Sequence, residues 1–259
     1  MAWFNFKKKL TCFALCAVLA LFGFGKAHAE TQERAKVMLI EALSKIGKAK
    51  QIKFTVFVSE ERIFKNLETL NFFYKYSVEL AEEDKVVLDL PRVNGVSRIF
   101  YNEGNFSYLD VTRSLYKTEK IDLDDKDIFS VLREKYQLTL PGVDLVTKHF
   151  RDDMERWAKH SSYIGLERLQ SGPAHHLAYF SDPIDWQVWV DRKSKLPVYM
   201  IVTYNQIEGE PQTHMKFSEW KISSVLKSDL FEFSPPKGAK SFSSQVLTST
   251  ESEAEEGGL

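Results

Sequence analysis

Two adjacent histidines, His175 and His176, are the residues of this sequence best suited to metal binding or proton transfer. Imidazole nitrogens bind zinc and exchange protons near neutral pH. The segment that contains the pair has the character of a strand. Neighbouring strand residues point to opposite faces of a sheet, so the two rings cannot hold one metal in regular geometry. His149, His160 and His214 are scattered along the chain. We therefore expect no metal site and no cofactor.

Three aspartates, Asp182, Asp185 and Asp191, bracket a tryptophan-containing segment and could act as paired carboxylates in general acid–base catalysis. They stand where strands begin and end, however, and aspartate is favoured in turns because its side chain bonds the nearby backbone. The chain has neither a G-x-S-x-G nor an H-E-x-x-H motif, and both cysteines, Cys12 and Cys16, lie close to the N-terminus. We therefore expect no catalytic residue.

The segment 185–204, DWQVWVDRKSKLPVYMIVTY, indicates a different role, because two apolar runs flank a basic turn that ends in Leu-Pro. Alternation predicts two paired strands, with bulky residues on both faces. Large rings suit the lining of apolar cavities, so Trp186 and Trp189 are candidate ligand contacts, although most strand tryptophans cover a sheet. Two apolar faces indicate a curved sheet that encloses apolar residues and is partly covered outside.

The more uniformly apolar face of this hairpin is assigned to the cavity. Unpaired polar groups facing a cavity would each cost about 1–3 kcal/mol, which leaves Gln187 and Thr203 on the opposite face. The same wall is expected to continue onto the strands on either side. The nine residues expected to line the cavity are Leu177, Tyr179, Trp186, Val188, Val190, Met200, Val202, Met215 and Phe217.

The spacing of apolar residues, which changes along the chain, predicts the helices and strands around the hairpin. Residues 31–48 carry apolar side chains at i, i+3, i+4 and i+7, which predicts a helix that Thr31 caps and Gly47 ends. The period then changes to 2, and a second helical region is expected at 124–158. Strands are expected at 52–58, 69–79, 85–90, 97–102, 105–111, 114–120, 162–170, 174–180, 186–190, 198–205 and 213–220. Short links between consecutive strands predict a mostly antiparallel sheet.

The first 29 residues have the features of a cleavable signal peptide. A lysine run at 7–9 precedes an apolar stretch from Leu10 to Phe24, and Ala27-His28-Ala29 matches the small-x-small cleavage pattern. The apolar stretch is short for a membrane span of about 20 residues, although an uncleaved anchor remains an alternative. We expect a periplasmic protein that begins at Glu30 and has no membrane span after cleavage.

The charge of the mature chain argues against nucleic-acid binding. Removing the four lysines of residues 1–29 from the 35 basic residues leaves 31 against 36 acidic ones, a formal charge of −5. No basic stripe remains to bind phosphates. The mature chain has no cysteine, so its apolar core alone must hold an exported fold of 230 residues (30–259).

The last residues, 244–259, are rich in Ser, Thr, Glu and Gly and have little to bury, so we expect a disordered acidic tail after one domain at 30–243. Deleting Ser244 to Leu259 should change the melting temperature by no more than about 2 °C, because exposed polar tails contribute little to stability. A thermal melt of the truncated protein checks this, and a large drop would show that the tail packs against the domain.

The later motifs resemble those of one protein family. HHLAYF, DWQVWVD, KLPVYMIVTY, PQTHMKFSEWKI and LFEFSPPKGAKSF follow one another at the spacing of a family of predicted periplasmic proteins of unknown function, related in fold to the lipoprotein carriers LolA and LolB. IFYNEGNFSYLD and YQLTLPGVDLV resemble its earlier motifs, so the resemblance spans roughly residues 35–242. It implies a β-dominated α+β fold, a half-open antiparallel β-barrel with an N-terminal helix and a helical plug.

Three functions are weighed from these observations. The leading hypothesis is a periplasmic binding protein, not an enzyme, whose apolar cavity takes a lipid, an acyl chain or another hydrophobic ligand. The second is a module that senses the envelope or binds an envelope protein and has no dedicated small ligand. An enzyme is the third hypothesis, and the missing catalytic motifs count against it.

Overall fold

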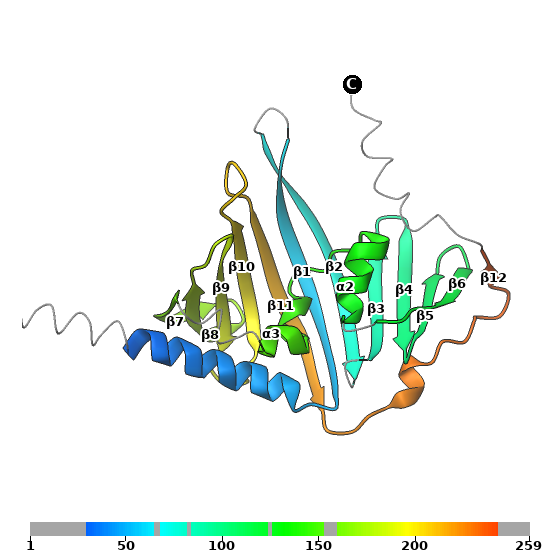
Figure 1. Ribbon diagram of the computed structural model, residues 1–259, viewed down its shortest axis with the longest axis horizontal. Helices are drawn as coiled ribbons and strands as arrows, with labels where there is room; N and C mark the ends of the chain where they lie inside the picture. The colour runs from blue at the N-terminus through cyan, green and yellow to red at the C-terminus, as the bar shows by residue number, and fades with distance from the viewer. Residues whose placement is uncertain (1–29, 65–67, 82–83, 124–125, 153–159, 243–259) are drawn as a thin grey trace, which may run out of the picture.

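The computed structural model describes residues 30–64, 68–81, 84–123, 126–152 and 160–242. The expected signal peptide, the expected tail and part of the helical region expected at 124–158 lie outside these residues. Within the described part of the chain, the strands form one twelve-stranded sheet in the order β12-β6-β5-β4-β3-β2-β1-β11-β10-β9-β8-β7 (Figure 1). The two ends of this order are not paired with each other, so the sheet is open.

The strands agree closely with those predicted from the alternation of apolar residues. Their bounds are β1 Gln51–Ile63, β2 Thr69–Ala81, β3 Lys85–Arg92, β4 Gly95–Asn102, β5 Asn105–Asp110, β6 Leu115–Lys120, β7 Ser161–Leu169, β8 Gly172–Tyr179, β9 Ile184–Asp191, β10 Pro197–Tyr204, β11 Gln212–Ser223 and β12 Lys240–Ser241. All neighbours pair antiparallel except β12, which runs parallel to β6. The prediction of a β-dominated, mostly antiparallel fold with an N-terminal helix is confirmed.

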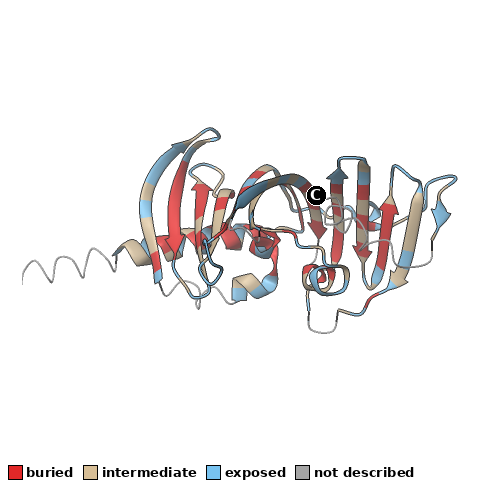
Figure 2. Cartoon of the chain, turned by 90° about the horizontal axis from the view of Figure 1, so that it is seen from above, coloured by how far each residue is buried: buried red, intermediate tan, exposed pale blue. Residues whose placement is uncertain are grey.

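The N-terminal helix and the second helical region pack on one face of the sheet, which we call the inner face (Figure 2). Residues 30–47 are helical, and their predicted apolar stripe is buried in the core. The second helical region consists of α2 (Ile128–Tyr136), the 3-10 helix η1 (Val143–Val146) and α3 (Lys148–Asp152). The Asp127 side chain accepts a hydrogen bond from the Ser130 N–H at 3.0 Å and caps α2, which therefore starts four residues after the expected start of the helical region at 124.

No helix in the described part of the chain has the length and apolar character that a membrane span requires.

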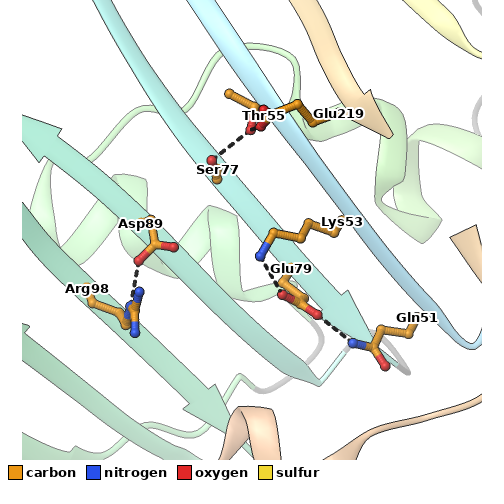
Figure 3. Close-up of polar contacts among 8 residues, drawn as sticks. All are labelled: Gln51, Lys53, Thr55, Ser77, Glu79, Asp89, Arg98 and Glu219. Atoms are coloured by element: carbon orange, nitrogen blue, oxygen red, sulfur yellow. Dashed lines mark hydrogen bonds and ion pairs between the residues drawn. The ribbon is translucent and has the colours of Figure 1, made fainter. Parts of the chain in front are cut away.

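The outer face of the central strands carries paired polar side chains (Figure 3). Glu79 accepts hydrogen bonds from Gln51 at 2.5 Å and from Lys53 at 3.0 Å, and Arg98 pairs with Asp89 at 2.5 Å. Gln51 is buried, and the other four side chains are partly exposed. The middle of the sheet therefore has one apolar face and one solvated polar face.

A C-terminal segment covers the outer face of β3 to β6. Phe231 is fully buried at the end of the 3-10 helix η3 (Ser228–Phe231), which packs against β3 and β4. The Phe233 ring lies 5.3 Å from that of Phe100 and 5.6 Å from that of Tyr116. The alternation of Phe231 and Phe233 suggests a final strand or edge segment. The strand interpretation is wrong, because Phe231 ends a 3-10 helix and Phe233 follows it outside any strand.

Candidate functional site

The nine residues predicted to line a cavity lie on the inner face of β8 to β11. Val188 stands opposite Leu177 on one side and Met200 on the other, and Met200 stands opposite Met215. Eight of the nine are buried, and Val202 is half-buried. The strand register thus agrees with the face assignment made from alternation. Contact between these residues and a ligand stays a prediction.

Other parts of the chain cover this wall. The Tyr179 ring stacks on that of Trp186 with centroids 3.9 Å apart, and the Tyr179 hydroxyl donates to the Ala35 carbonyl of the N-terminal helix at 3.2 Å. The Phe150 ring of α3 meets the edge of Trp186 at 5.7 Å. Trp186 is therefore enclosed between its own sheet and the helices above it.

Gly142 lets the chain before η1 approach the same wall closely. Its φ of +90° favours glycine, and a Cβ at this position would lie 2.8 Å from Phe217 Cζ and 3.1 Å from Met215 Sδ. The LPG sequence that ends in Gly142 thus has a packing role. Together these contacts show that the N-terminal helix, α3 and the chain before η1 cover the inner face of β8 to β11.

Trp189 lies on the outer face, in a cluster with His176. The two rings stack with centroids 4.1 Å apart, and Glu167 accepts a hydrogen bond from the Trp189 indole at 2.8 Å. His176 contacts Glu167 through Nδ1 at 2.8 Å and Gln187 through Nε2 at 2.9 Å. The bond from Trp189, with a smaller contribution from His176, lowers the pKa of Glu167. Both ring nitrogens of His176 are therefore engaged in the sheet.

His175 points to the inner face, where its Nδ1 lies 3.2 Å from the Tyr163 hydroxyl. Partial burial lowers its pKa. The two adjacent histidines thus occupy opposite faces, as strand alternation predicts. Across the described ranges, no three His, Asp or Glu side chains come close enough together to hold a metal ion.

The three aspartates around β9 hold turns. Asp185 accepts a hydrogen bond from the Ser181 N–H at 3.0 Å, and Asp191 accepts from the Ser194 N–H at 2.5 Å. Although burial acts in the opposite direction, the bonds from Ser194 lower the pKa of Asp191. Asp182 accepts from the Gln206 amide at 2.8 Å. The prediction that these carboxylates are turn formers is confirmed for Asp185 and Asp191, which accept hydrogen bonds from nearby backbone N–H groups.

The sheet is split along part of the boundary between β2 and β3, which we call the seam. The two strands pair from Ala81 opposite Lys85 to Ser77 opposite Asp89, and no further. Beyond that point β2 pairs only with β1, and β3 pairs only with β4. Figure 1 shows the strands diverging there with α2 in front of them. The Tyr76 hydroxyl donates to the Pro141 carbonyl, which ties the α2–η1 linker (137–142) to the seam.

Two hollows open at the seam, beside the linker. The β1-side hollow has a volume of about 590 Å³ and the β5-side hollow about 640 Å³. Both volumes fall in the range of about 300–1,000 Å³ that is typical of small-molecule sites. The residues that line both hollows are Tyr74, Leu90, Pro91, Arg92, Gln137 and Leu138.

The β1-side hollow combines apolar residues with charged ones at the end of the β1–β2 hairpin. Glu60 pairs with Arg62 at 3.2 Å and accepts a hydrogen bond from the Tyr74 hydroxyl at 3.1 Å. Burial, and then the charge of Glu60, raises the pKa of Tyr74, so the phenol stays protonated. Thr213 lines this hollow and stands opposite Val202, which links the hollow to the predicted wall.

The β5-side hollow has fewer charged residues in its lining, three against five in the β1-side hollow. Ile99, Phe106 and Leu115 are among the residues that line it. The Phe106 ring stacks on that of Tyr136 of α2 at 4.9 Å. Helix α2 therefore forms one side of this hollow, as a covering helix would.

None of the nine predicted lining residues borders either hollow. The residues that do were missed, because they come from strand ends and from the linker and not from the strongly alternating strands. One signal was present at Leu90-Pro91. Proline has no N–H to donate, so a proline within a strand indicates that the ladder is interrupted there.

The chain resembles several solved structures at low identity. A conserved protein from Thermus thermophilus is 10% identical with a TM-score of 0.42, and the match covers 79% of this chain and 96% of that one. LprF from Mycobacterium bovis is 12% identical with a TM-score of 0.42, covering 73% and 94%. A LolA superfamily protein from Nitrosomonas europaea is 11% identical with a TM-score of 0.35, covering 74% and 97%.

No curated protein sequence matches the chain. A family model does match, over residues 35–243, and its description agrees with the family indicated by the motifs from HHLAYF to LFEFSPPKGAKSF. Because that match extends over most of the sequence, the chain belongs to the DUF2092 family of predicted periplasmic proteins.

Proposed function

We propose that this protein is a non-enzymatic binding protein of the periplasm that holds an acyl chain or another hydrophobic ligand at the seam. The observation that carries the proposal is the pair of adjoining hollows, of about 590 and 640 Å³, lined largely by apolar side chains. Glu60, the carboxylate best placed for chemistry there, is engaged by Arg62 and Tyr74. The arrangement thus favours binding over catalysis.

The predicted wall would extend the site. Val202 stands next to Thr213 of the β1-side hollow, so an apolar surface continues from the hollow under the helices. Burying one methylene is worth about 0.8 kcal/mol, so a chain of about ten carbons would gain on the order of 8 kcal/mol before the costs of association. The nine wall residues are proposed as the deeper part of the site, and the hollows as the part open to a ligand.

Leu138→Trp tests this function, because Leu138 lines both hollows and the larger ring would fill the space where they meet. The expected result is that the wild-type protein binds the hydrophobic fluorophore N-phenyl-1-naphthylamine and that the variant binds it about tenfold more weakly or not at all. Fluorescence titration measures both affinities. Lipid extraction and native mass spectrometry of the protein purified from the periplasm would then identify the natural ligand.

Leu166→Trp is the matched control, because Leu166 is exposed on β7, at the far end of the sheet. This variant should bind the fluorophore like the wild type. The proposal fails if the wild-type protein binds no hydrophobic probe, or if both tryptophan variants bind equally well.

A protein-interaction module is the second candidate, and the β1–β2 hairpin favours it. Phe57 is 46% exposed and Phe73 is 64% exposed, and their rings stack with centroids 6.2 Å apart. Exposed apolar pairs of this kind can mark contact surfaces. Replacing Phe57 with serine should leave fluorophore binding unchanged under the leading proposal, because Phe57 borders neither hollow. A stable protein complex that is lost in this variant would support the second candidate instead.

A further inference from the structure

We infer that the β5-side hollow takes an acyl chain that ends in an anionic head group, with the head held at Arg92 and Arg113. The inference rests on the proposed function and adds to it the chemical class of the ligand and the direction in which it enters. Its basis is the distribution of charge around this one hollow.

Arg92 stands at the mouth of the hollow, at the end of β3. Alternation along β3 places it on the inner face with Leu88 and Leu90, and it stands opposite Gly95 in β4. The Thr112 side chain occupies the space beside Gly95, where a Cβ would lie 2.1 Å from the Thr112 hydroxyl oxygen. Arg113 reaches the same hollow from the turn that follows β5. Arg92 from the end of β3 and Arg113 from the turn after β5 therefore both line this hollow.

The charges of this lining favour an anion. Its charged residues are Arg92, Arg113 and Asp110, which gives a net charge of +1 in a chain whose formal charge is −1. The Asp110 carboxylate accepts a hydrogen bond from the Arg113 backbone N–H at 2.7 Å and lies 3.8 Å from the Arg113 Nε. Asp110 thus shapes the turn that presents Arg113. Guanidinium groups bind carboxylates and phosphates through paired N–H donors.

The interior of the hollow suits a chain and not a head group. Leu90 and Ile99 are buried there, and the buried hydroxyls of Ser97 and Tyr108 lie 2.8 Å apart and hydrogen-bond each other. A charged head group placed among these buried side chains would lose its hydration, and burying an unpaired charge is costly. The chain should therefore enter first, and the head should stay at the arginines.

The lining of the β1-side hollow also has a net charge of +1, from Arg62, Lys75 and Arg92, but it includes two carboxylates, Glu60 and Glu61. They would repel an anionic head group placed beside them. The β5-side lining has one carboxylate, Asp110, which already accepts a hydrogen bond from the Arg113 N–H, so this hollow is the more favourable of the two for an anionic head group.

The test compares cis-parinaric acid, a fluorescent fatty acid, with its uncharged methyl ester at about pH 8, where the carboxyl group is ionised. In the full mature protein, the double variant Arg92→Gln with Arg113→Gln should bind the acid about fivefold or more weakly, because an exposed ion pair contributes modestly. Binding of the ester should not change. Arg168→Gln, on the exposed edge strand β7, should change neither affinity.

Competition separates the two sources of such a head group. Displacement of the probe by oleate identifies a carboxylate, and displacement by lysophosphatidylglycerol identifies a phosphate, and either supports the inference. Equal displacement by uncharged monoolein would overturn it. An equal loss of acid and ester binding in the double arginine variant, or no loss of either, would also overturn it while leaving the proposed function intact. If neither probe binds the wild-type protein, the proposed function itself fails.

Discussion

Val188→Asp is expected to lower the free energy of unfolding by about 3 kcal/mol or more. The Val188 side chain has no exposed surface and stands between Leu177 and Met200 on the inner face. A carboxylate there would have no polar partner and would lose its hydration. Urea unfolding, followed by tryptophan fluorescence, measures the change.

Gln187→Asp is the matched control, because Gln187 is the next residue of β9 and points to the outer face. This variant loses only the contact between the Gln187 side chain and His176 Nε2, at 2.9 Å. Its free energy of unfolding should therefore fall by about 1 kcal/mol or less. Equal destabilisation by the two variants would mean that the face assignment of β9 is wrong.

The burial of Val188 and Met200 limits the use of charged substitutions at the wall as a test of ligand binding. From the sequence, a charged residue at Val188 or Met200 would be expected to abolish ligand binding while the fold persists. Val188 is fully buried and Met200 is 7% exposed, so loss of the fold is the expected outcome at Val188. Ligand binding is better tested at Leu138, which borders the hollows and is only half-buried.

The faces of the strands could be predicted because alternation in a strand is a local property. Trp186 and Val188 fall on one face and Gln187 on the other from sequence position alone, and the register with β8 and β10 places neighbours on the same faces. The N-terminal helix could be predicted for the same reason, since its stripe is a repeat within a single segment.

The seam and its hollows could not be predicted in this way. They depend on the point where β2 and β3 stop pairing, at Ser77 and Asp89, and on a contact between Tyr76 and Pro141, which are 65 residues apart. The apolar pattern of a strand does not state how far its ladder extends. Only Pro91 marked the place, because proline cannot donate to a ladder.

In the C-terminal segment, by contrast, a local sequence pattern was present but predicted the wrong structure. Phe231 and Phe233 repeat with period 2, as in a strand, yet Phe231 ends a 3-10 helix. Two apolar residues are too few to distinguish an alternating strand from a turn with two anchors. What decided the structure was the apolar outer surface around Phe100 and Tyr116, which this segment covers.

Phe231→Ala is therefore expected to lower the free energy of unfolding by about 3–5 kcal/mol, the usual cost of removing a buried phenylalanine ring. The ring is fully buried where η3 packs against β3 and β4, and its loss would leave a cavity under the C-terminal segment. Urea unfolding of the purified variant measures the change.

Phe233→Ala is the control for this prediction. Phe233 is only half-buried, so removing its ring should cost about 1–2 kcal/mol, less than at Phe231. Because both rings lie on the outer face, neither variant should change the affinity for a hydrophobic probe in the absence of urea. An unchanged stability in Phe231→Ala would show that the segment is not part of the folded unit. A changed probe affinity in that variant would show that the outer face and the hollows are coupled through β3 and β4, the strands that carry Leu90 and Ile99 into the hollow.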